Sequence, residues 1–246
     1  MNRQAQAVVL LLFGGAILKA SITDLHLRYV KEGLRPFLLL TGAFLVLTAI
    51  FTLWYELRPA AGRKRAQPVP DPGHSETHDH AHHEPRVGWL LLLPVIALLL
   101  VAPPALGAFT AGQSGTLTAT AESDYGPLPE GDPVAVGLLD YASRSIYDDA
   151  RSLAGRRVQL TGFLSTGPDG GPMLARIVVS CCAADGRPIK IGLTGGPAVD
   201  VPSGTWLQVT GRHSTRRAKD PVNQADIAYL EVEQWQPITP PKQQYE

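Results

Sequence analysis

The chain has 246 residues, 45% of them hydrophobic, and its 22 basic side chains balance 22 acidic ones. A formal net charge of zero argues against a nucleic-acid-binding protein, because such proteins carry a basic face. The two cysteines are adjacent, which excludes a scaffold held by several disulfide bonds. Charged residues are nearly absent from three apolar runs in the first half of the chain, so we expect a membrane protein that continues into a polar domain.

The three apolar runs predict a transmembrane region over residues 1–109, with spans at about residues 5–22, 34–54 and 88–108. A span needs roughly 20 apolar residues to cross about 30 Å of hydrocarbon. The second run meets this length, the first does so if Lys19 extends its amine to the interface, and prolines shorten the third. A cleaved signal peptide is the alternative for the first run, although another apolar run follows almost at once. Close helix packing is predicted at Gly14, Gly15 and Gly42.

The distribution of Lys and Arg predicts the orientation in the cell membrane. The linker after the second run carries Arg58, Arg63, Lys64, Arg65 and Arg86, whereas the segment after the third run has no basic residue before Arg144. This places the N-terminus and the linker in the cytoplasm and the C-terminal domain outside the cell. The loop between the first two runs disagrees, since it carries Arg28, Lys31 and Arg35 yet should face outward.

The linker over residues 56–87 is rich in histidine. Its five histidines are His74, His78, His80, His82 and His83. Neutral imidazole is the commonest protein ligand of zinc-class metals, and a spacing of two residues suits a flexible chelate. The segment has no apolar periodicity, so we expect an extended or disordered loop. It is interpreted equally well as a cytoplasmic metal-collecting loop or as a solvated linker that binds metal only incidentally.

Beyond the spans, residues 110–137 are rich in small and polar residues and predict a tether, and residues 138–246 predict an exported β domain. Helical spacing over Leu138–Leu153 precedes five short strand-like runs. The runs are 157–164, 174–182, 189–193, 206–211 and 227–235. Five short strands in about 80 residues favour a closed OB-like barrel, with a β-sandwich as the alternative. The segment Arg216-Arg217-x-Lys219 is interpreted as a solvated loop, and the strands lack the basic, aromatic stripe of a nucleic-acid-binding barrel.

The adjacent cysteines, Cys181 and Cys182, are expected to end a strand shortly before Asp185. Neighbouring strand residues point to opposite faces, so the two thiols could share an ion only where the strand bulges or turns. Three interpretations remain open: a metal site completed by Asp185 or His213, a redox switch or vicinal disulfide, and two small strand residues without chemistry. Thiolates bind soft and borderline metals, so zinc is the cofactor that we expect if an ion binds.

No recognisable catalytic motif is present. The sequence contains no Gly-x-Ser-x-Gly, no phosphate-binding loop and no His-Glu-x-x-His. We therefore do not expect an enzyme.

Several short motifs carry a resemblance that extends over most of the chain. They are Tyr29-Val30, Arg35-Pro36-Phe37, Gly155–Phe163, Ala175–Asp185 and Trp206–Gly211, and Arg176-x-x-x-x-Cys-Cys-Ala-Ala-Asp185 is the most specific of them. With these motifs the chain resembles a YcgQ-like family of bacterial permease subunits. The resemblance implies a two-part membrane protein, a larger multi-spanning permease as its partner, and a link to zinc or other metal homeostasis. It implies no catalytic residues.

The sequence thus predicts the accessory subunit of a two-component permease, linked to the handling of a zinc-like divalent metal. Its expected partners are the lipid bilayer and the larger permease subunit, because three spans are too few to build an alternating-access pore. The alternative is a membrane-anchored envelope sensor or interaction module with no transport role. A thiol-redox protein is a third hypothesis, but an adjacent cysteine pair lacks the Cys-x-x-Cys spacing of such proteins.

Overall fold

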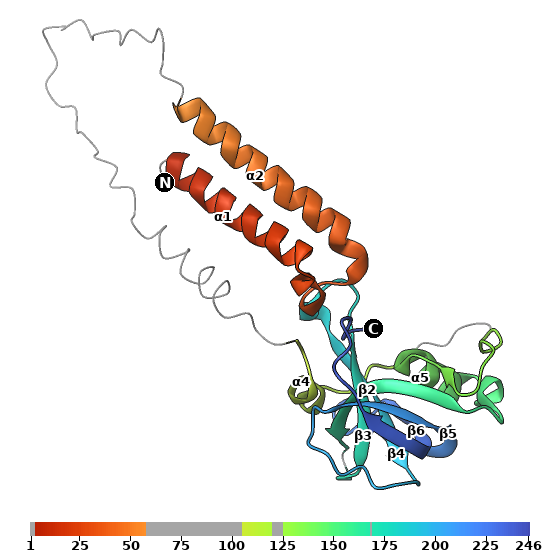
Figure 1. The fold of residues 1–246 in the computed structure, drawn as a ribbon. Coiled ribbons are helices and arrows are strands. Elements are labelled where there is room, and N and C mark those ends of the chain that lie inside the picture. The colour runs from red at the N-terminus through yellow and green to blue at the C-terminus, as the bar shows by residue number, and fades with distance from the viewer. Residues whose placement is uncertain (1–2, 58–104, 120–124, 168) are drawn as a thin grey trace, which may run out of the picture. The chain divides into compact units, whose positions relative to one another are not determined.

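A computed structural model describes residues 3–57, 105–119, 125–167 and 169–246 (Figure 1). The described residues fall into two compact units. The helical unit comprises residues 3–24 and 35–57, and the barrel unit comprises residues 25–34 and 105–246. Residues 25–34, which connect the two helices of the first unit along the chain, therefore belong to the second unit. We call them the docking segment.

The helical unit is a pair of helices, α1 (Arg3–Ile22) and α2 (Arg35–Leu57), which lie side by side (Figure 1). Their closest approach is at Gly14 and Gly42. A Cβ atom on Gly14 would lie 3.0 Å from the Gly42 carbonyl oxygen, and one on Gly42 would lie 3.2 Å from the Gly14 carbonyl oxygen. Small residues let helix backbones approach in this way. The predicted packing is confirmed at these two positions, whereas Gly15 has nothing within 4 Å of its Cβ position.

Membrane-capable helices are fewer than the sequence predicts. Within the described residues, one stretch, Glu32–Glu56, is long and apolar enough to cross a membrane, and Gln6–Ile22 is a shorter apolar helix. The longer helix could be a membrane anchor, and a signal sequence near an N-terminus has the same character. The expectation of three clear spans is corrected to this one helix. Most of the third predicted span lies outside the described residues, as does the linker with its five histidines. Residues 105–109 belong to the barrel unit instead.

Five strands form the closed barrel: β2 (Val158–Thr166), β3 (Pro172–Val178), β4 (Arg187–Thr194), β5 (Trp206–Lys219) and β6 (Asp226–Pro237). Neighbours follow the order β2-β3-β4-β6-β5, and β5 pairs with β2 to close the ring. The β4–β6 pair is parallel and the other pairs are antiparallel. Closure satisfies strand edges that would otherwise be exposed. The predicted five-stranded, all-β domain is therefore confirmed, with a short strand β1 (Val134–Ala135) added beside β2.

Alternate residues of the strands fill the barrel, as the period of a half-buried strand requires. The side chains of Leu160, Ile191, Leu207 and Leu230 come from four different strands and are fully buried in one cluster. Helix α5 (Leu138–Tyr147) packs on the barrel, and its Tyr141 hydroxyl donates to the Tyr229 carbonyl at 2.7 Å.

The helix predicted over Leu138–Leu153 ends at Tyr147. Asp149 and Ala150 adopt left-handed conformations, with φ of 46° and 58°, which break the helical run. A 3-10 turn, η4 (Arg151–Leu153), follows and returns Leu153 to the core. The apolar residues therefore keep helical spacing up to Leu153, although the helix itself ends at Tyr147.

Residues 110–137, predicted as a tether, contribute to the barrel unit at several points. Helix α4 (Ala108–Gln113) buries Ala111. Downstream, the Thr116 N–H donates to Asp220 at 2.9 Å, and the Lys190 ammonium donates to Asp220 at 3.1 Å and to the Ser114 carbonyl at 2.7 Å. A buried carboxylate needs such partners, so this stretch is fixed in place despite its linker-like composition.

The segment Arg216-Arg217-x-Lys219, predicted as a loop, lies inside the long strand β5. Its pairing with β6 extends to the Lys219–Asp226 pair. The Arg216 guanidinium lies 4.5 Å from the centre of the Tyr229 ring and donates to Asp169 at 3.0 Å. The Arg216 side chain therefore packs on Tyr229 and pairs with Asp169 within the barrel unit.

Replacing Gly14 by leucine should weaken the helical unit, because the new side chain would collide with the backbone of α2. Overpacking of this kind costs about 1–3 kcal/mol. We expect the Gly14→Leu chain in detergent to lose its helical circular-dichroism signal at a lower temperature than the wild type. Gly15→Leu, one residue away and facing open space, is the matched control. Equal melting of the two variants would contradict the close packing.

Candidate functional site

The candidate site is a turn between β3 and β4, Ser180–Asp185, which we call the cysteine turn. Strand β3 ends at Val178, and a 3-10 helix, η5 (Ala183–Asp185), follows Cys182. The strand that was predicted to run to Cys182 thus ends four residues earlier. Because the chain turns here, the alternation of a regular strand no longer separates the two thiols. One ligand atom each from Cys181, Cys182 and Asp185 lie within 4.8 Å of one another.

Asp185 organises this turn through its carboxylate. Its Oδ1 accepts the Ser180 N–H at 2.7 Å, and its Oδ2 accepts the N–H groups of Cys181 at 2.8 Å and of Cys182 at 3.2 Å. The hydrogen bond with the Cys181 side chain and these backbone donors lower the pKa of Asp185 to about 2. Asp185 is consequently a fixed negative charge at neutral pH.

The same carboxylate controls the Cys181 thiol. Its hydrogen bond to the Asp185 side chain, followed by one to Cys182, raises the pKa of Cys181 to about 12. Both cysteines are free, with Cys181 exposed and Cys182 half-buried. Thiol redox chemistry and metal binding both require the thiolate, which Asp185 disfavours, so a cation at this turn would have to displace the thiol proton.

A disulfide between the two cysteines fits the local backbone poorly. Their Cα atoms are separated by one trans peptide bond, a distance of about 3.8 Å. Disulfides usually span Cα atoms roughly 4.4–6.8 Å apart. A vicinal disulfide would therefore be strained.

The docking segment pairs with the cysteine turn through its main chain. The Lys31 N–H donates to the Cys181 carbonyl at 3.0 Å, the Ala183 N–H donates to the Tyr29 carbonyl at 2.6 Å, and Val30 forms an antiparallel bridge with Cys182. Sequence reasoning missed this contact, because main-chain pairing over about 150 residues leaves no periodic signal in either segment.

A second anchor of the docking segment comes from the end of the chain. The Tyr245 hydroxyl donates to the Arg28 carbonyl at 2.7 Å and accepts the Leu106 N–H at 2.9 Å. Tyr245 itself is buried and forms a parallel bridge with Ile177 of β3. Three parts of the chain, far apart in sequence, thus meet beside the cysteine turn.

The predicted ligands divide into three groups. Cys181, Cys182 and Asp185 come together, and within the described part of the chain they form the group of His, Cys, Asp and Glu side chains suited to a metal ion. His213, the other predicted completion of the site, lies on β5, where its Nδ1 is 3.2 Å from the Ser145 hydroxyl. The linker histidines (His74, His78, His80, His82 and His83) lie outside the described residues.

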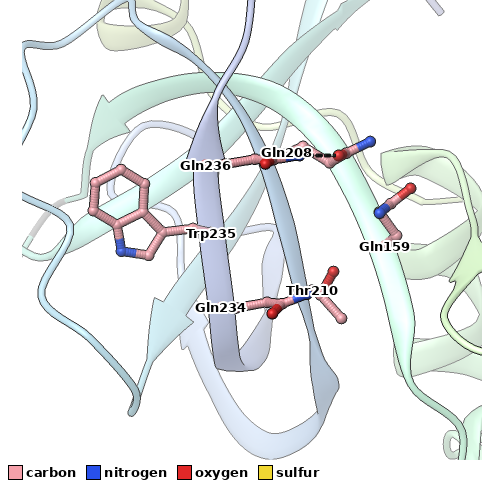
Figure 2. A pocket seen from close by; sticks show the side chains of 6 residues that line it. All are labelled: Gln159, Gln208, Thr210, Gln234, Trp235 and Gln236. Carbon is pink, nitrogen blue, oxygen red and sulfur yellow. Dashed lines mark hydrogen bonds between the residues drawn. The ribbon is translucent and has the colours of Figure 1, made fainter.

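A separate hollow of about 140 Å³ lies over three neighbouring strands (Figure 2). Amide side chains and one hydroxyl surround it: Gln159, Gln208, Thr210, Gln234 and Gln236. Gln236 donates to Gln208 at 2.7 Å, and Trp235 points away from these amides in Figure 2. The lining carries neither a charge nor a thiol, so it offers no acid, base or metal ligand.

Comparison with known proteins bears on the barrel unit. Residues 139–246 match the family model of the DUF1980 C-terminal domain. The matched region contains α5 from Leu139 onward, the five barrel strands and the cysteine turn. No curated protein and no solved structure matches the chain. The YcgQ-like name and the permease partner stay predictions.

Replacing Asp185 by asparagine should make Cys181 more reactive, because it removes the charge that raises the thiol pKa. A lower pKa increases the thiolate fraction more than it reduces nucleophilicity. In a Cys182→Ala background at neutral pH, we expect Asp185→Asn to speed alkylation of Cys181 by iodoacetamide at least about tenfold, as followed by mass spectrometry. Asp169→Asn is the control. An unchanged or slower rate would contradict the assigned hydrogen bond.

Proposed function

We propose that this protein is a membrane-anchored accessory subunit of a two-component permease, and that its barrel binds one zinc-class divalent ion at the cysteine turn. The observation that carries the proposal is the convergence of two thiols and an ionised carboxylate within 4.8 Å. Thiolate sulfur and carboxylate oxygen are zinc ligands. The ion would replace thiol protons, which pass to water, and no electron would be transferred.

The donor set favours an exchangeable ion over a structural one. Structural zinc sites close the tetrahedron with four protein ligands, whereas open sites use three. Cys181, Cys182 and Asp185 supply three, and Cys181 is exposed. Such a site suits the capture and transfer of an ion.

Membrane attachment is supported by the surface of α2. Its large apolar residues are exposed along one helix face with alternating spacings of three and four: Phe37, Leu40, Phe44, Leu47, Phe51 and Trp54. A surface of this size is covered by lipid or by other helices. Because few spans cannot form a transport pathway by themselves, a larger permease subunit is the partner that we propose.

The docking segment supports the topology that we propose. Residues 25–34 and 105–246 form one unit, so they lie on the same side of any membrane. If α2 crosses that membrane, the chain must return between Leu57 and Ala105, where the third span is predicted. The basic linker supports a cytoplasmic position for the far end of α2, and hence an extracytoplasmic barrel.

The finer description of the barrel as OB-like is part of this proposal. Around the barrel the strands follow the order β2-β3-β4-β6-β5 and return to β2, and β4 and β6, the third and fifth barrel strands in sequence, are parallel. This connectivity supports an OB-like barrel over a β-sandwich.

Zinc titration of the full chain tests the metal site. To isolate the barrel, the five linker histidines are first replaced by asparagine. In this background we expect one zinc ion per chain, with affinity reduced at least about tenfold by Cys181→Ser, Cys182→Ser or Asp185→Asn and unchanged by Asp169→Asn, because each of the first three removes a ligand.

Affinity purification of the native chain from membranes tests the transport role. We expect a multi-spanning permease to copurify. A chain that binds zinc at none of these residues and retains no permease would contradict the proposal and favour the envelope interaction module.

A further inference from the structure

The docking segment forms main-chain hydrogen bonds with the cysteine turn on both sides of Cys182. One hydrogen bond reaches the carbonyl of Cys181, and another leaves the N–H of Ala183. Cys182 stands between these two bonds and is itself bridged to Val30. The backbone on both sides of Cys182 is thereby fixed by a segment about 150 residues earlier in the chain.

This pairing helps to position the ligands. The direction of a side chain follows from its own backbone conformation, so the peptide groups around Cys182 set how the two thiols converge. Asp185 holds the N–H groups of the turn from one side, and the docking segment holds a carbonyl and an N–H from the other. Releasing the docking segment would leave the Asp185 carboxylate and the hydrogen bond from the Asp185 N–H to the Cys182 carbonyl to keep the ligands together.

We propose that ion binding at the cysteine turn and attachment of the docking segment are coupled, so that each strengthens the other. The inference rests on the proposed metal site. A preformed site avoids the entropy of ordering its ligands, and a coupling between two binding events is reciprocal. The occupied turn therefore retains the docking segment more tightly, and the attached segment raises the affinity for the ion.

The consequence concerns the membrane helices. The docking segment continues directly into α2, which begins at Arg35, and it follows α1, which ends at Ile22. Four residues lie between Val30 and Arg35. A change in the attachment of the segment is thus passed to both helices through the chain itself. Binding of the ion to the barrel would in this way alter the restraint on α1 and α2, the helices that we propose to contact lipid or a partner subunit.

Two substitutions at Lys31 test the coupling without changing any of the proposed ligands. Lys31→Pro removes the N–H that donates to Cys181, whereas Lys31→Ala keeps that N–H and removes the same charge. In the full chain with asparagine at the five linker positions, we expect Lys31→Pro to bind zinc about tenfold more weakly than Lys31→Ala. A second variant, Ala183→Pro, removes the donor to Tyr29 at the first position of η5, where proline is well tolerated. It should weaken zinc binding similarly relative to Ala183→Ser.

Amide hydrogen exchange measures the reverse effect, in which zinc binding strengthens the attachment of the docking segment. Saturating zinc should slow exchange of the Lys31 and Ala183 amides about tenfold and leave the Leu164 amide, which is bonded within the barrel unit, unchanged. Equal zinc affinities within both variant pairs, or unchanged exchange at Lys31 and Ala183 on zinc saturation, would overturn the coupling and leave the metal site intact. Failure of the parent chain to bind zinc would overturn both.

Discussion

The pairing of the docking segment with the cysteine turn is the contact on which the structural account depends. It joins residues that lie between two apolar helices to a barrel more than a hundred residues later. Main-chain hydrogen bonds in this pairing, with Tyr245 as a second anchor, hold both segments in one compact unit. In the proposed topology both segments therefore lie on one side of the membrane. They also fix the backbone that carries the two thiols. Topology and ligand geometry therefore have one physical cause.

Asp185 sets the charge of the cysteine turn, whose backbone the docking segment holds in place. Its carboxylate accepts three backbone N–H groups and a thiol, so it shapes the turn and sets its charge at the same time. A carboxylate beside a thiol raises the thiol pKa, which disfavours the thiolate nucleophile and means that a bound cation must displace the thiol proton. In the proposed metal site, the exposure of Cys181 and a set of three protein ligands suit an exchangeable ion better than a permanent one.

Sequence reasoning identified the elements whose signals are local. Alternating apolar residues and turn residues marked all five barrel strands, and small residues marked the Gly14–Gly42 contact. It failed where distant partners decide the structure. The start of residues 110–137 looked like a tether because Thr116 and its neighbours are polar, yet the buried Asp220 accepts the Thr116 N–H and holds this part against the barrel. The end of β3 before Cys181 was missed because the docking segment and Asp185, which shape the turn, leave no periodic pattern.

The most direct test of the account is whether the docking segment and the barrel share one side of the membrane. Single cysteines at positions Glu32, Asp200 and Glu56, each exposed, would be introduced into a chain with Cys181→Ser and Cys182→Ser. With an impermeant maleimide on intact cells, we expect labelling at positions 32 and 200 and, only after permeabilisation, at position 56. Labelling of intact cells at one of positions 32 and 200 without the other would contradict the account.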